Sequence, residues 1–196
     1  AVKHPKWKMG KKISIDSSTL MNKVLEVIEA KKIFDLNMNK IDILINPNSY
    51  IHAIIIFNNG TIKFLAHETK MDIPIFNSIY KNQNSEKKYQ TKELDIKKIN
   101  SINLSKPNIK KFKFLRILNM VPEKDSLFET ILVSVNDELV HKFLNNKIKY
   151  KNLSFYLMKI IKFKVFNKYY KIQPKSVKQI LNVRNFAKKI VNENIN

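Results

Sequence analysis

The chain has 196 residues, of which 44% are apolar, enough to build a hydrophobic core and to exclude wholesale disorder. It has no cysteine, which excludes disulfides, thiolate metal sites and cysteine nucleophiles. No apolar run reaches the roughly 18 residues that a transmembrane helix needs, so we expect no membrane partner. Because the first residue is Ala rather than Met, we expect the N-terminus to be a cut end, with any targeting peptide upstream of it.

The formal net charge of +21 allows two interpretations. The lysines can bind a polyanion by releasing counterions from its phosphates, or they can reflect a general bias toward Lys, Asn and Ile. The second is favoured because Arg116 and Arg184 are the only arginines, the residue type that forks onto bases and phosphates. The lysines are also spread along the whole chain. We therefore expect no specific nucleic-acid binding, although a basic nucleic-acid-binding module stays open as an alternative.

The first 40 residues predict a loop, a short extended segment and a helix. Residues 1–12 form the loop around Trp7, and the alternating pattern of 13–15 indicates an extended segment. Asp16, Ser17 and Ser18 then offer capping side chains for a helix over 20–34, whose apolar residues have helical spacing.

A small antiparallel sheet follows in the sequence. Segments rich in β-branched residues predict strands over 41–46, 51–57 and 61–66. Asn59-Gly60 is typical of the turn in a hairpin between the last two strands. Pro74, in a first-turn position, indicates a short helix over 72–80.

The second half of the chain changes character after a polar stretch over 81–100 that has no sustained periodicity. Apolar spacing then predicts helices over 112–120, 129–146, 153–166 and 173–192. The fold class is therefore α+β: a small, mostly antiparallel sheet with helices, a linker, and a C-terminal helical bundle. The corresponding predicted domains are residues 1–80, 81–111 and 112–196.

A phosphate site can be built around the start of the helix that follows Ser17. A helix N-terminus presents unpaired N–H groups and the positive end of its dipole, which suits phosphate. Ser17 would add a hydroxyl, Asn22 a neutral donor and Lys23 a positive charge. Glu26 would share their helical face, where a carboxylate is useful if a divalent cation bridges the substrate. The alternative is purely structural: Ser17 caps the helix, and Glu26 pairs with Lys23 on a solvated face.

The loop before this helix also allows two interpretations. Trp7 is either a core anchor or part of a mobile lid, and the lysines on both sides favour the lid. His4 can donate a hydrogen bond to a phosphate or polarise an oxygen, or it can have no role.

These residues together resemble a known family. Residues 4–30, HPKWKMGKKISIDSSTLMNKVLEVIEA, closely resemble the signature HPxWxMGxKIxxDSATMMNKGLExIEA of the 1-deoxy-D-xylulose 5-phosphate reductoisomerases. Residues 46–64 resemble that family's HPQSxxHSxVxYxDGSxxA segment, residues 70–80 its PDMRxPIxYAL segment, and residues 133–150 its LNAANExAVxxFLxxxIxF segment.

The resemblance implies an NADPH-dependent oxidoreductase that rearranges 1-deoxy-D-xylulose 5-phosphate and reduces the resulting aldehyde to 2-C-methyl-D-erythritol 4-phosphate. This reaction belongs to the non-mevalonate pathway of isoprenoid biosynthesis, and the divalent cation would be Mg or Mn. The residues carried over by motif match are Ser17, Asn22 and Lys23 for the phosphate; Glu26 for metal binding and catalysis; His4 for substrate contact and catalysis; Trp7 and Met9 for the closing flap; and Gly10 for NADPH.

The resemblance covers only the C-terminal half of the family's pattern. The dinucleotide-binding domain and the Asp-Ser-Glu metal motif of the N-terminal half are absent, so we expect the chain alone to be inactive. The family also implies a homodimer, with residues 41–66 as the candidate surface, and the Lys/Asn bias suggests an apicomplexan member that operates in the apicoplast.

Several positions depart from the family's pattern. Val24 replaces a Gly and adds a branched side chain near the site, Asn46 stands where a His is usual, and residues 67–70 replace the usual stretch through Pro-Asp. Val133 and Asp137 depart from LNAANE, although Asn136 is kept. A non-catalytic or decaying relative of the enzyme therefore stays open as an alternative.

Overall fold

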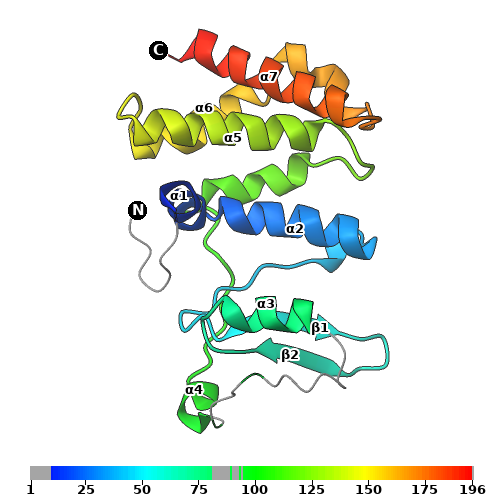
Figure 1. Cartoon of the computed structure of the whole chain (residues 1–196), viewed down its shortest axis with the longest axis vertical. Coiled ribbons are helices and arrows are strands. Elements are labelled where there is room, and N and C mark those ends of the chain that lie inside the picture. Colours follow the sequence, from blue (N-terminus) through cyan, green and yellow to red (C-terminus); the bar gives the residue numbers. More distant parts are fainter. Residues whose placement is uncertain (1–9, 81–88, 90–92, 94, 196) are drawn as a thin grey trace. The chain divides into compact units, whose positions relative to one another are not determined.

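The computed structural model describes residues 10–80, 89, 93 and 95–195 (Figure 1). The chain forms two compact units, one of residues 1–42 with 108–196 and one of residues 43–107. The fold is α+β as predicted, because helices build the first unit and the second contains a two-stranded antiparallel sheet. None of the helices in the described ranges is long and apolar enough to cross a membrane.

The three predicted domains follow the order of the predicted elements, whereas the two units are defined by packing. The division into 1–80, 81–111 and 112–196 stays a prediction.

The first unit begins with two helices, α1 (Lys11–Thr19) and α2 (Met21–Phe34). Leu20 separates them with a φ of 61°, in the left-handed region that few non-glycine residues adopt. The backbone therefore turns between α1 and α2, and they do not form one continuous helix.

The extended segment predicted over 13–15 is wrong, because these residues lie inside α1. Ile13 and Ile15 alternate as in a strand, but Ile15 is buried and Ile13 is exposed. Burial recurs four residues on at Thr19, which is the helical period.

The predicted capping role of Asp16, Ser17 and Ser18 is also wrong. All three lie inside α1, and no side chain caps either helix. The hydroxyl of Ser18 instead donates a hydrogen bond of 2.8 Å to the carbonyl of Ile15 in its own helix.

A C-terminal helical bundle completes the first unit. Its elements are η2 (Lys113–Met120), α5 (Phe128–Leu144), η3 (Tyr150–Asn152), α6 (Leu153–Ile160), η4 (Lys164–Tyr170) and α7 (Val177–Asn194). Helix α5 packs against α1, α6 and α7 (Figure 1), and its Ile131, Leu132 and Val135 are fully buried. The central position of α5 follows from this burial.

The predicted helices of the bundle are present with changed ends. The helix predicted over 112–120 is a 3₁₀-helix, η2. The one predicted over 153–166 ends as α6 at Ile160, because the extended backbone of Phe163 interrupts it before η4 begins.

The second unit contains an antiparallel hairpin of β1 (Ile51–Ile56) and β2 (Ile62–Ala66), as predicted. Gly60 has a φ of 83° in the connecting turn, a conformation that glycine adopts without steric cost. Helix α3 (Asp72–Ile79) follows, also as predicted. The short helix α4 (Ile96–Asn100) lies within the segment predicted as a linker.

The strand predicted over 41–46 is wrong. Within the described part of the chain only Ile45 of this segment pairs, in an isolated bridge with Ser105. Its β-branched residues indicated a strand, but a ladder also requires a neighbouring segment in register. Residues 38–40 just before it form a 3₁₀-helix, η1 (Met38–Lys40).

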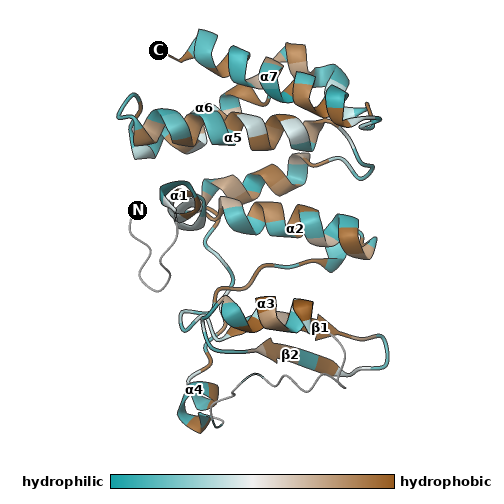
Figure 2. Cartoon of the chain, in the orientation of Figure 1, coloured by the Kyte–Doolittle hydropathy of each residue, from teal (hydrophilic) through white to brown (hydrophobic). Residues whose placement is uncertain are grey.

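The hairpin exposes many apolar side chains of its own. Every residue of β2 is exposed, and Ile56 at the end of β1 is 74% exposed. Figure 2 shows apolar residues along both strands.

Candidate functional site

The predicted phosphate residues meet where α1 turns into α2. The side-chain amide of Asn22 donates a hydrogen bond of 2.7 Å to the hydroxyl of Ser17, from the first turn of α2 to the last turn of α1. Both side chains are partly exposed. The left-handed residue Leu20 makes this contact possible, because the two positions would lie on different faces of a continuous helix.

Lys23, next to Asn22, forms an ion pair with Glu26 one turn further along α2. The Lys23 ammonium lies 2.5 Å from Oε2 of Glu26, and the two side chains are 44% and 54% exposed. An exposed pair of this kind contributes little to stability. Each of the two groups can therefore leave the other and bind a ligand. The pairing predicted by the structural interpretation is present, and it leaves both charges accessible.

Val24, which stands in place of the family's Gly, is directed away from this face. Val24 and Met21 are fully buried in the core of the first unit, and Val27 beside them is also buried. Because Val24 lies two positions from both Asn22 and Glu26, about 200° around the helix, it packs on the opposite side.

Gly10 is the residue just before α1. It has ordinary backbone angles, and a Cβ atom added there would meet no described residue within 4 Å. The described residues therefore leave space beside Gly10, which is compatible with a bound ligand. His4, Trp7 and Met9, the other residues predicted before α1, lie outside the described residues.

Sequence reasoning missed a buried polar cluster directly behind Ser17. Asp16 is buried, its Oδ2 lies 2.8 Å from the Lys12 ammonium, and its Oδ1 accepts a hydrogen bond of 2.9 Å from the amide of Asn136 on α5. Lys12 also lies 2.9 Å from Oδ1 of Asp137. The spacing of Lys12 and Asp16 is a local i,i+4 signal, but no local pattern could have found Asn136, which is 120 residues from Asp16.

The electrostatics of this cluster favour the charged form of Lys12. Partial burial lowers the pKa of Lys12, but the hydrogen bonds and charges of Asp16 and Asp137 outweigh it and hold the pKa above its usual value. Lys12 therefore carries a full positive charge at neutral pH and neutralises part of the buried carboxylate charge.

A second contact joins α1 to the bundle. The hydroxyl of Tyr150 donates a hydrogen bond of 2.9 Å to the hydroxyl of Ser18. A cleft lies beside this contact, and its lining as the structure describes it contains lysines but no carboxylate: Ser18, Thr19, Lys111, Phe112, Lys113, Phe114, Tyr150, Lys151 and Ser154. The positive charge of this cleft would attract an anion.

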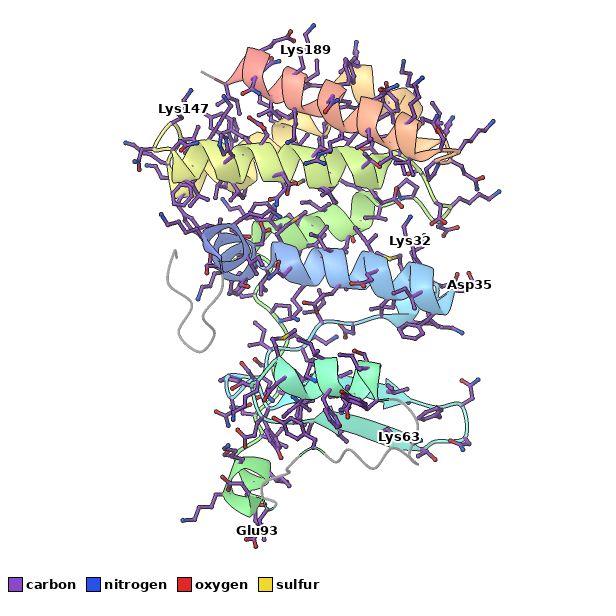
Figure 3. All side chains as sticks on the ribbon, in the orientation of Figure 1. Lys32, Asp35, Lys63, Glu93, Lys147 and Lys189 are labelled. Carbon is purple, nitrogen blue, oxygen red and sulfur yellow. The ribbon has the colours of Figure 1, made fainter. Side chains whose placement is uncertain are left out.

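The lysines are not confined to that cleft. Figure 3 shows Lys32, Lys63, Lys147 and Lys189 projecting from different elements. The positive charge is therefore distributed over the elements rather than gathered in one stripe.

Glu26 is the only one of the predicted site residues in the described part of the chain that offers a carboxylate to a metal. Those parts of the chain hold no group of three His, Asp or Glu residues placed to bind one ion. Asp16 is not available either, because both of its oxygens already have partners. The described residues can therefore supply one metal ligand but not a complete metal centre.

Comparison with known proteins shows which family this chain is similar to. Residues 1–34 match the family model described as 1-deoxy-D-xylulose 5-phosphate reductoisomerase C-terminal domain, and residues 67–190 match the model described as DXP reductoisomerase C-terminal domain. The chain belongs to the DXP reductoisomerase family. The second model alone covers more than half of the chain, so the resemblance seen in the sequence is confirmed.

The curated relatives carry the same name. The chain is 53% identical over 187 residues to the 1-deoxy-D-xylulose 5-phosphate reductoisomerase of Pelagibacter ubique, covering 95% of this chain and 48% of the relative. It is 34% identical over 188 residues to the apicoplastic reductoisomerase of Plasmodium falciparum, covering 96% of this chain and 38% of that protein. The chain thus spans about half or less of the length of these relatives.

Solved structures agree with the fold. A DOX-P reductoisomerase in complex with NADPH, fosmidomycin and magnesium superposes with a TM-score of 0.87 at 28% identity, covering 98% of this chain and 48% of that one. The reductoisomerase of Zymomonas mobilis in complex with NADPH gives a TM-score of 0.80 at 25% identity, with the same coverage.

Proposed function

We propose that the chain is the substrate-holding half of an NADPH-dependent reductoisomerase that converts 1-deoxy-D-xylulose 5-phosphate to 2-C-methyl-D-erythritol 4-phosphate. The observation that carries this proposal is the contact between Ser17 and Asn22, with Lys23 and Glu26 exposed beside it. Membership of the family supports the same reaction, and so does the bound chemistry of the similar structure with NADPH, fosmidomycin and magnesium.

Ser17, Asn22 and Lys23 would bind the phosphate of the substrate. The Ser17 hydroxyl and the Asn22 amide already lie within hydrogen-bonding distance of each other, so one phosphate oxygen can accept from both. The Lys23 ammonium would turn from Glu26 to the phosphate and neutralise its charge. Together the three residues fix one end of the sugar phosphate, which orients its carbonyl end for reaction.

Glu26 would bind the divalent cation once Lys23 has turned to the phosphate. A bound Mg or Mn ion would hold the vicinal oxygens of the substrate and polarise its carbonyl. Because the described residues supply a single carboxylate here and the chain spans about half of its relatives, the remaining ligands would come from the part of the protein outside this chain. The chain alone would therefore be inactive.

The cofactor and flap residues complete the proposal. Gly10 would lie against NADPH, since no described residue fills the space beside its Cα. His4 would contact the substrate as a catalytic residue, and Trp7 and Met9 would form the flap that closes over it. The roles of His4, Trp7 and Met9 are carried over from the family's motif.

The assembled protein would be a homodimer that uses residues 41–66. The exposed apolar side chains of β1 and β2 support this surface, because exposed apolar patches commonly mark protein interfaces. An apicoplast location is supported by the apicoplastic Plasmodium relative, to which the chain is 34% identical.

The test is turnover of 1-deoxy-D-xylulose 5-phosphate by the full-length protein with NADPH and Mg²⁺ or Mn²⁺. We expect consumption of NADPH that depends on both the substrate and the metal. A full-length protein that binds the sugar phosphate without oxidising NADPH would instead support the non-catalytic relative. Turnover by the 196-residue chain alone would contradict the proposed division of the site.

A further inference from the structure

The angle between α1 and α2 is not set by a continuous helix. Leu20 breaks the backbone between them with a φ of 61°. Ser17 lies on one side of this break and Asn22 on the other, so their separation depends on how α1 is held. Contacts made by α1 with the rest of the first unit must therefore fix the phosphate geometry.

Besides α2, helix α1 packs against α5 (Figure 1). The residue directly before Ser17 makes the central polar contact, because the Asn136 amide donates a hydrogen bond of 2.9 Å to Oδ1 of Asp16. Lys12 binds the other carboxylate oxygen at 2.8 Å and reaches Asp137 on α5 at 2.9 Å. Asp16 and Asn136 are both buried.

Such a contact is directional in a way that apolar packing is not. A buried carboxylate must keep its hydrogen bonds, since water cannot replace a lost donor. Rotation of α1 that moved Ser17 would break the bond between Asp16 and Asn136. The contact therefore resists the motion that would separate Ser17 from Asn22.

We propose that Asp16 and Asn136 are positioning residues, through which the C-terminal bundle sets the place of Ser17 against Asn22 for phosphate binding. Neither residue would touch the substrate. This inference rests on the proposed function, because it concerns the same phosphate site. It gives helix α5 a role in substrate affinity, although α5 supplies none of the proposed binding residues.

The exchange of donor and acceptor tests the proposal. Asn136→Asp places a second carboxylate against Asp16, and we expect the KM for the sugar phosphate to rise about tenfold or more, with kcat at saturation changed less. The double variant Asp16→Asn with Asn136→Asp restores a donor facing an acceptor. We expect it to bring KM back to within about threefold of the parent. Asn136→Ser serves as a milder variant if Asn136→Asp does not fold.

Ser126→Ala is the matched control, because it also breaks a buried hydrogen bond near α5. The Ser126 hydroxyl donates to Glu129 at 2.7 Å and accepts from the backbone N–H of Phe128 at 3.2 Å. Glu129 lies seven residues before Asn136, about 10 Å along the helix. We expect Ser126→Ala to lower the unfolding temperature without changing KM.

The outcomes are distinct. An unchanged KM in every Asp16 and Asn136 variant that folds, or an equal rise of KM in Ser126→Ala, would overturn the positioning role alone. Turnover of the parent protein is measured first, because its absence would contradict the proposed function. In that case the dissociation constant of inorganic phosphate replaces KM in the same comparison, and the positioning role is still tested.

Discussion

The amide of Asn22 reaches back across a helix break to bind the hydroxyl of Ser17 at 2.7 Å. This contact joins two helices that the backbone itself does not align, because Leu20 between them is in the left-handed region. It places two neutral hydrogen-bonding groups at one point, beside the exposed charges of Lys23 and Glu26. A dianionic phosphate and a metal ion need such a mixture of neutral donors and opposite charges.

Lys23→Ala should weaken phosphate binding with little effect on the fold. Loss of one charge-assisted hydrogen bond corresponds to about 1.5–3 kcal/mol of binding free energy, seen as a higher KM for the sugar phosphate. Stability should change by less than about 1 kcal/mol, since the exposed Lys23–Glu26 pair contributes little. Lys147→Ala, at an exposed position after α5, is the control with the same loss of charge. Equal effects of the two substitutions would point to nonspecific electrostatic attraction instead.

Glu26→Gln should abolish the metal-dependent turnover of the full-length protein. The amide keeps the size of the side chain but removes the negative charge that a divalent cation requires. Metal titrations of NADPH oxidation measure the effect, and urea unfolding checks that the fold is retained. Glu29→Gln, at an exposed position on the next turn of α2, should behave like the parent. Near-normal turnover of Glu26→Gln would remove Glu26 from the proposed metal ligands.

Ile56→Glu should disrupt the proposed homodimer. Ile56 is 74% exposed at the end of β1, so a charge there should not unfold the hairpin, but it would be desolvated in an interface. Sedimentation of the full-length protein should show the monomer mass at concentrations where the parent is a dimer. Val177→Glu, at a 72% exposed position at the start of α7 and outside residues 41–66, is the control. A dimer that persists in Ile56→Glu would place the interface elsewhere.

The residues of the candidate site were more predictable than the geometry that joins them. The motif that contains Ser17, Asn22, Lys23 and Glu26 identified the family, and Asn59-Gly60 identified the hairpin, because both signals are local. Local signals also explain the errors. The alternation of Ile13 and Ile15 indicated an extended segment, whereas contacts with the bundle made α1 a helix.

Long-range partners could not be predicted from the sequence. Asp16 appeared to be a capping residue, and Asn136 only a retained motif position, until the fold brought them to 2.9 Å. In the same way Ile45 pairs with Ser105 in an isolated bridge, where its composition predicted a full strand. The composition of a segment shows which secondary structure it can adopt. The segments that pair or pack with it determine which one it adopts.

The ion pairs of Lys12 should make stability fall at alkaline pH. Asp16 and Asp137 raise the pKa of Lys12 above its usual 10.5 in the folded chain, against the opposing effect of partial burial. The folded state therefore holds this proton more tightly than the unfolded state does. The resulting stabilisation is fully present below about pH 10.5 and is lost as the pH rises through the higher pKa of the folded state.

Lys12→Met isolates this contribution from the titration of the other lysines. The variant keeps a long apolar side chain but cannot pair with Asp16 or Asp137. Urea unfolding at pH 8 and at pH 11 should show a larger stability difference between parent and variant at pH 8, because at pH 11 the parent has begun to lose the same charge. Lys11→Met, on the exposed side of α1, should show no such pH-dependent difference. A difference for Lys12→Met that stays constant from pH 8 to pH 11 would mean that Lys12 stabilises α1 by packing rather than by charge.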